Sequence, residues 1–152
     1  MNNTHSEMDY IIQFCACANL RKAARSVTQA YERKMESTGL KVTQYYMLVN
    51  IARHDKISIS NLGDVMLLDQ STVTRNVNVL KNSGYVDIAR DPIDSRTKSV
   101  SITDIGLAKL EEATPIWLQI QEKIEKDIGQ EKYADLLETL KKLQEFVESY
   151  DR

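Results

Sequence analysis

The 152-residue sequence predicts a mainly α-helical protein with a small β-hairpin wing, in which a winged helix-turn-helix lies between the two parts of a helical dimerisation region. Both ends of the chain carry apolar residues at helical spacing, and the middle changes to two short helices followed by two short strands. Long amphipathic helices need a partner surface to bury their apolar stripes. We therefore expect residues 1–38 and 104–152 to form the dimerisation region and residues 39–103 to form the winged helix-turn-helix.

The two ends of the chain predict long helices with clear start and stop signals. One amphipathic helix is expected over residues 9–36, with Gly39 as its stop. Thr43 is a candidate N-cap of the next helix. After the middle region, Thr103 is a candidate N-cap where helix resumes, and Gly129 divides the C-terminal part into two helices.

The middle of the chain predicts a helix-turn-helix. Ser60 can cap a short helix over residues 61–67. Asp69 or Gln70 can cap a second helix, which Gly84 ends. The inner face of this second helix carries three apolar residues at helical spacing, Val73, Val77 and Leu80.

A β-hairpin is expected directly after the helix-turn-helix. Tyr85–Ala89 and Thr97–Ile102 have the composition and alternation of strands. The residues between them, 90–96, are polar and contain Asp and Pro, which is typical of a turn. A hairpin in this position is the wing of a winged helix.

The charge distribution removes an objection to nucleic-acid binding. The net charge is −2, which by itself disfavours a polyanionic partner. Residues 104–152 carry seven Lys/Arg and twelve Asp/Glu, so the acidic excess lies in this part of the chain. Residues 56–103 carry six Lys/Arg and five Asp/Glu. Within residues 70–85 the charged residues are Arg75 and Lys81, both positive. The local field over the second short helix therefore favours phosphate contact.

The outward face of that second helix has the chemistry of a major-groove helix. It carries hydroxyl and amide groups with one arginine, whereas a merely solvated face usually includes glutamate. Arginine matches guanine, asparagine matches adenine, and hydroxyls reach phosphates or base edges. The partner predicted from these groups is double-stranded DNA. The predicted DNA-binding residues are Ser60, Gln70, Ser71, Thr72, Thr74, Arg75, Asn78, Lys81, Arg90, Ser95 and Arg96.

Four runs of sequence together resemble the MarR family of bacterial and archaeal regulators: residues 69–75, 80–84, 90–96 and 100–106. The resemblance extends over nearly the whole chain, and the wing pattern around Asp94 and Arg96 is its most specific part. It implies a homodimer that binds a palindromic operator and most often acts as a repressor. It also implies that Arg96 enters the minor groove and that Asp94 orients the wing arginines. An arginine at a hairpin tip suits a narrow minor groove on electrostatic grounds.

Two kinds of signal are left open by the sequence. By resemblance to the organic-hydroperoxide-sensing branch of the family, Cys17 is the candidate reactive thiol and Tyr31 its hydrogen-bonding partner, although Val42 stands where that branch has a second tyrosine. The alternative role of Cys17 is a small core residue. The other signal is a phenolic or similar aromatic effector. The candidate residues for its pocket are Arg21, Arg25, Tyr45, Tyr46 and Trp117.

Several other classes of function find no support in the sequence. It has no glycine-rich phosphate loop and no spacing of Ser, Cys, His and Asp that is typical of an enzyme, and we expect no cofactor. The two histidines lack partners at ligand spacing, so no metal site is expected. Neither a signal peptide nor a membrane span is evident, which predicts a cytoplasmic protein. A winged-helix protein-interaction module is the alternative to a DNA-binding regulator.

Replacing Arg96 with alanine tests the predicted wing contact. Operator binding is expected to weaken strongly because a minor-groove cation is lost, while the fold is retained because a hairpin tip contributes little to the core. The measurement is a DNA titration at fixed salt, with circular dichroism as the control for folding. Unchanged affinity would contradict the role assigned to the wing.

Overall fold

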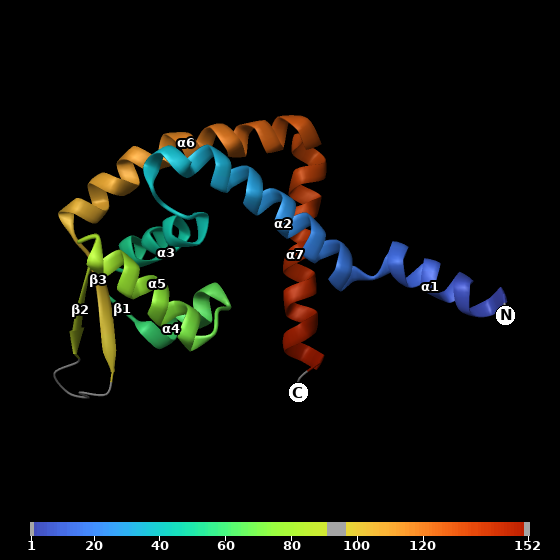
Figure 1. The fold of residues 1–152 in the computed structure, drawn as a ribbon, viewed down its shortest axis with the longest axis horizontal. Coiled ribbons are helices and arrows are strands. Elements are labelled where there is room, and N and C mark those ends of the chain that lie inside the picture. Colours follow the sequence, from blue (N-terminus) through green and yellow to red (C-terminus); the bar gives the residue numbers. More distant parts are fainter. Residues whose placement is uncertain (1, 91–96, 151–152) are drawn as a thin grey trace. The chain divides into compact units, whose positions relative to one another are not determined.

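The computed structural model describes residues 2–90 and 97–150 of the chain (Figure 1). Within this range no helix is long and apolar enough to cross a membrane. The chain divides into two compact units, residues 1–114 and residues 115–152. The elements in chain order are α1 (Asn2–Phe14), α2 (Ala16–Met35), the 3-10 helix η1 (Glu36–Thr38), α3 (Val42–Arg53), β1 (Ile57–Ser58), α4 (Ile59–Met66), α5 (Gln70–Asn82), β2 (Val86–Arg90), β3 (Lys98–Ile102), α6 (Asp104–Ile128) and α7 (Gln130–Tyr150).

The N-terminal region is two helices, so the prediction of one helix over residues 9–36 is wrong. The backbone leaves the helical region at Cys15, where ψ is 111°. The Asn19 side-chain amide holds this break, because its Nδ2 donates to the carbonyl oxygens of Gln13 and Cys15, each at 3.0 Å. Periodicity could not show the break because the apolar spacing continues through it.

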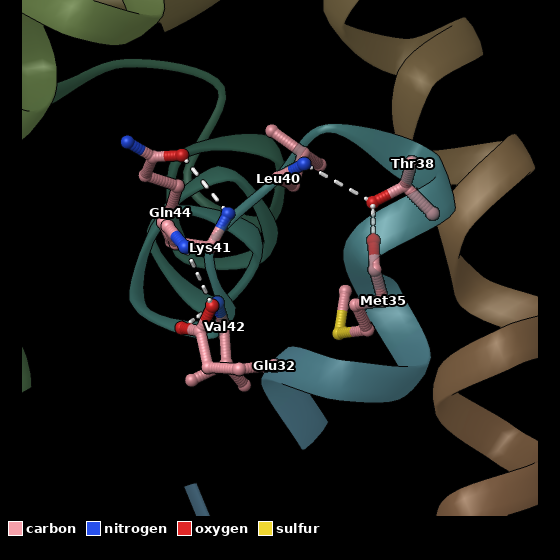
Figure 2. A network of polar contacts seen from close by, with 7 residues as sticks. All are labelled: Glu32, Met35, Thr38, Leu40, Lys41, Val42 and Gln44. Atoms are coloured by element: carbon pink, nitrogen blue, oxygen red, sulfur yellow. Dashed lines mark hydrogen bonds and ion pairs between the residues drawn. The ribbon is translucent and has the colours of Figure 1, made fainter. Parts of the chain in front are cut away.

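The corner between α2 and α3 is fixed by two hydrogen-bonded side chains (Figure 2). Buried Thr38 donates from Oγ1 to the Met35 carbonyl at 2.7 Å and accepts from the Leu40 backbone N–H at 3.1 Å. Glu32 accepts the Val42 N–H at 2.9 Å, and its other oxygen lies 3.4 Å from the Lys41 ammonium. Residues on both sides of the corner are thereby held in one arrangement.

The start of α3 differs by two residues from its predicted start. Lys41, not Thr43, is the N-cap residue, and its backbone N–H is satisfied by the Gln44 side chain at 3.0 Å. Gly39 confirms the expected stop signal, because it adopts φ 73°, a left-handed conformation that costs glycine little.

The helix-turn-helix forms as predicted, with one shifted cap. Ser58, not Ser60, caps α4, and its hydroxyl accepts from the Asn61 N–H at 3.0 Å. Asp69 caps α5, which is one of the two caps expected there. The inner face of α5 is buried, also as expected, since Val73, Val77 and Leu80 are at most 1% exposed.

The sheet has three strands rather than the two of a simple hairpin. β3 is central and pairs antiparallel with β2 on one side and β1 on the other. Val100 lies opposite Ile88 in β2 and opposite Ile57 in β1. A two-residue strand such as β1 has too little pattern to be predicted from sequence, yet it ties the start of α4 to the base of the wing.

Several elements meet at a wing–helix junction, which we define as Gly84, Tyr85, Thr103, Gly106 and Lys109. The Thr103 hydroxyl donates to the Gly84 carbonyl at 2.6 Å and accepts from the Gly106 N–H at 3.1 Å, which confirms it as a cap. The Thr103 N–H donates to the Tyr85 carbonyl at 3.1 Å. The ends of α5 and β3 and the starts of β2 and α6 are therefore joined at one point.

Lys109 connects this junction to the α2–α3 corner. Its Nζ donates to the Thr38 carbonyl at 3.0 Å and to Glu112 at 2.7 Å, and it lies 5.9 Å from the centre of the Tyr85 ring. The hydrogen bond to Glu112 raises the pKa of Lys109 above its ordinary value, so the ammonium stays charged. The first half of α6 is thus bonded to both ends of the winged helix.

The second unit contains the rest of α6 and α7, which Gly129 separates as predicted, with φ 90°. The Gln121 amide donates within α6 to Glu125 at 2.8 Å, and across this turn to the Tyr133 hydroxyl at 2.7 Å. The outer surface carries exposed ion pairs, such as Lys123–Asp127 at 2.7 Å, that contribute little to stability. Leu136, Leu137 and Phe146 on α7 are large apolar residues that remain exposed in a single chain.

Replacing Gly106 with alanine tests the close packing at the junction. An added Cβ would overlap the Tyr85 carbonyl oxygen and lie 2.8 Å from Ile102 Cγ1, so backbone must move. Overpacking of this kind costs about 1–3 kcal/mol, measurable as a lower midpoint of denaturant unfolding at fixed protein concentration. The matched control is Glu111→Ala on the exposed face of α6, expected within about 0.5 kcal/mol of wild type. Equal stability of the two variants would contradict the packing described here.

Candidate nucleic-acid interface

The outer face of α5 presents a shallow concave surface of polar side chains. Gln70, Ser71, Arg75 and Asn78 are exposed and Thr74 is half-buried, and all five line this surface. Within the described part of the chain, Arg75 forms no ion pair, so its guanidinium is available to a ligand. Five of the residues predicted to bind DNA are thereby brought together on one face.

The N-terminal end of α5 is organised by the carboxylate of Asp69. Its Oδ1 accepts from the Ser71 hydroxyl at 2.5 Å and from the Thr72 N–H at 2.8 Å, and its Oδ2 accepts from the Thr72 hydroxyl at 2.7 Å. These hydrogen bonds, the one from Ser71 above all, hold the pKa of Asp69 far below its ordinary value. The two hydroxyls, predicted as free groups for DNA, are therefore already bonded within the protein.

A second hollow, of about 300 Å³, connects α4, α5 and the base of the wing. Ser60, Gln70, Thr74 and Asn78 line it, as do several residues that sequence reasoning missed. α5 thus shares one continuous surface with its neighbours. The missed residues of this hollow are Ser58, Ile59, Ile88, Thr97 and Lys98, and on the outer face of α5 they are Val79 and Asn82.

Some of these missed residues could have been recognised from the sequence, and others could not. Lys98 is an exposed cation at the start of β3, and its place beside the turn of the hairpin could have indicated it. Val79 and Asn82 continue the helical spacing of Arg75 by four and seven positions. Ser58 was hidden because the start of α4 was placed two residues too late.

The remaining predicted DNA contacts lie around this surface or outside the described residues. Lys81 is exposed on α5 and Arg90 is exposed at the end of β2, but neither lines the two hollows. Asp94, Ser95 and Arg96 fall in residues 91–96, which the structure does not describe.

Three known proteins are similar to this chain over most of its length. The organic hydroperoxide resistance transcriptional regulator of Bacillus subtilis is 26% identical over 145 residues, covering 92% of this chain and 97% of that protein. The HTH-type transcriptional regulator SarZ of Staphylococcus haemolyticus is 27% identical over 125 residues, covering 82% of this chain and 84% of that protein. The crystal structure of the M. tuberculosis transcriptional regulator MosR in complex with DNA has 30% identity and a TM-score of 0.80, covering 89% of this chain and 97% of that one.

A profile of the MarR family matches residues 38–97, from the α2–α3 corner into the wing. The chain belongs to the MarR family. The MarR family and these relatives are transcriptional regulators, a class that is not enzymatic, as the sequence predicts. The mainly helical winged-helix fold expected from the resemblance to the MarR family is also confirmed.

Cys17 and Tyr31, the predicted redox pair of a peroxide-sensing MarR protein, are not brought together within one chain. Both lie on α2, fourteen positions apart, which places them about 21 Å from each other along the helix axis. Cys17 is exposed and Tyr31 is 8% exposed. The alternative that Cys17 is a core residue is therefore wrong for a single chain.

The two tyrosines predicted to line an aromatic-ligand pocket differ in their exposure. Tyr45 is buried and its hydroxyl lies 3.1 Å from that of Thr114, whereas its neighbour Tyr46 is 54% exposed. The two tyrosines therefore do not share one surface in a single chain. Arg21 and Arg25 are exposed on α2, and Trp117 is half-buried in the second unit. Among the described residues, no group of three or more His, Cys, Asp or Glu side chains could hold a metal ion.

Proposed function

We propose that the protein is a homodimeric repressor that binds a palindromic operator in double-stranded DNA, in the cytoplasm, through α5 and the wing. The observation that carries this proposal is the continuous surface over α4, α5 and the base of the wing. Among the described residues, those that line it mostly have hydrogen-bonding side chains, and they include the cations Arg75 and Lys98 and no carboxylate. Such a surface can contact phosphates and read base edges at once. The similarity to MosR, which was solved in complex with DNA, supports the same conclusion.

The proposed dimer rests on apolar side chains that a single chain leaves in water. On α1, Tyr10, Ile11, Ile12 and Phe14 are each more than half exposed. Contiguous apolar surface of this kind marks an interaction site. A second copy related by a twofold axis would cover it, and the same axis would present two α5 helices to two half-sites of a palindrome.

We further propose that the dimer is released from its operator by a chemical signal, either oxidation of a thiol or binding of a small aromatic ligand. Oxidation is favoured by the exposed thiol of Cys17, because a sensor thiol must be reachable by its oxidant. The similarity to a regulator named for organic hydroperoxide resistance supports this alternative. In such a dimer Tyr31 would act on Cys17 of the other copy, because the two are too far apart in one chain.

Replacing Arg75 with alanine tests the reading of DNA by α5. We expect the difference in binding free energy between operator and random duplex to shrink by about 1–3 kcal/mol, because a bidentate contact to guanine is lost. The probe is the DNA upstream of the gene that encodes the protein, titrated at several salt concentrations.

The matched control for Arg75 is Lys98→Ala. It should weaken binding to both duplexes equally and reduce the log–log salt slope by about 0.9, the contribution of one phosphate contact. Equal losses on both duplexes for Arg75→Ala would make Arg75 a phosphate contact. If wild type shows no steep salt dependence and no preference for the upstream DNA, the DNA-binding proposal fails and an interaction module is favoured.

Replacing Cys17 with serine separates the two kinds of signal. Cumene hydroperoxide is expected to release wild-type protein and the control variant Cys15→Ser from DNA, but not Cys17→Ser, because oxidation of a thiol to sulfenic acid needs that sulfur. The measurement is fluorescence anisotropy of labelled upstream DNA. If Cys17→Ser is released as readily as wild type, oxidation at Cys17 is contradicted, and release by salicylate would then support an aromatic effector.

A further inference from the structure

Ser71 lies near the N-terminal end of α5, on the exposed face of the helix. It lies in the first turn of α5, is exposed, and lines the concave surface with Arg75. In helix-turn-helix proteins the N-terminal residues of the second helix contact base edges. Which bases Ser71 can recognise depends on whether its hydroxyl donates or accepts.

In the structure, the proton of the Ser71 hydroxyl is already used in a hydrogen bond to Asp69. Ser71 Oγ lies 2.5 Å from Asp69 Oδ1, and a carboxylate oxygen can only accept, so the hydroxyl donates. Asp69 remains ionised, since the Thr72 N–H and hydroxyl donate to it as well. A hydrogen bond to a charged carboxylate is about twice as strong as one between neutral groups, so it is not readily given up for another acceptor. The Ser71 oxygen is left with lone pairs alone to offer a ligand.

The groups of a DNA duplex then divide into those that can bind here and those that cannot. Phosphate oxygens, guanine N7 and O6, adenine N7 and thymine O4 are all acceptors and find no proton at Ser71. The exocyclic amino groups of cytosine and adenine are the donors in the major groove. A carboxylate also accepts from cytosine N4, so Asp69 and Ser71 have the same polarity.

We propose that Asp69 and Ser71 form an acceptor-only site at the start of α5 that selects a base with an exocyclic amino group, cytosine or adenine, in the major groove. This inference rests on the proposed function and deepens it. Asp69 acts as the positioning residue, because it fixes the polarity of the Ser71 hydroxyl. Arg75, one turn further along α5, offers donors only and selects the opposite kind of base edge.

The first test removes the amino group from the DNA. A binding site is selected from a random duplex pool with wild-type protein, and each adenine or cytosine of one half-site is then replaced by purine or 2-pyrimidinone, which lack the amino group. At one position wild type should lose about 10-fold in affinity, the effect of one hydrogen bond to a charged network, while Ser71→Ala should lose nothing further there. The control Thr74→Ala should lose as much as wild type at that position.

The second test reverses the polarity of the site. Glycine is nearly as good an N-cap as aspartate, so Asp69→Gly keeps α5 intact, which circular dichroism checks. This substitution removes the carboxylate to which the Ser71 hydroxyl donates, which frees the hydroxyl proton to face the DNA. Selection with this variant should therefore yield guanine or thymine where wild type selects cytosine or adenine. Loss of the negative charge of Asp69 is expected to raise the affinity for every duplex. The base preference is therefore compared among sequences within one selection, where this general gain cancels.

Three outcomes separate this inference from the function on which it rests. A wild-type selection without any consensus would overturn the proposed operator binding itself. In a second outcome, a consensus is found, and the loss of affinity caused by Ser71→Ala disappears when one phosphate is replaced with a neutral methylphosphonate but not when an amino group is removed. Ser71 would then contact a phosphate, which would overturn the acceptor site alone. An unchanged base preference in Asp69→Gly would likewise overturn the role of Asp69, whereas the switch described above would establish it.

Discussion

The packing of Gly106 against the backbone of Tyr85 is the constraint on which the winged helix depends. With no side chain at residue 106, the start of α6 comes close enough for the Thr103 hydroxyl to bond to Gly84. The end of α5, both long strands of the sheet and α6 are then fixed to one another at the wing–helix junction. The residues of α5 and of the base of the wing that line the second hollow therefore share this anchor.

The elements that the sequence predicted are those with strong local signals. The buried face of α5 was predicted correctly, and its cap, Asp69, was one of the two alternatives predicted, since both features depend on residues within or next to one helix. The break at Cys15 and the strand β1 were missed because each depends on partners that periodicity does not reveal: the Asn19 amide in one case and the central strand β3 in the other. The caps of α3 and α4 were each placed two residues too late, because a nearby Thr or Ser offered a plausible alternative.

In the candidate site, too, the sequence predicted what depends on residue types along one helix and missed what depends on contacts between side chains. Residue types along α5 were enough to predict a DNA-reading helix, and five of those residues line one surface. Residue types could not tell whether a serine donates or accepts. That depends on Asp69, which in sequence is only a capping residue but in the structure determines where the protons of Ser71 and Thr72 point. In the sensing region, the resemblance to peroxide-sensing regulators suggested that Cys17 and Tyr31 interact, whereas within one chain α2 holds them far apart.

The uneven distribution of charge along the chain has a kinetic consequence. Residues 104–152 carry a net charge of −5, whereas residues 56–103 are slightly positive. A polyanion diffusing near such a molecule is repelled from the acidic part and attracted to the part that contains α5. Encounters are thereby biased toward orientations that can form a complex, and fewer collisions are wasted. In the proposed complex with DNA, the acidic helices would then influence how quickly the protein finds its site at low ionic strength and how steeply that rate falls as salt is added.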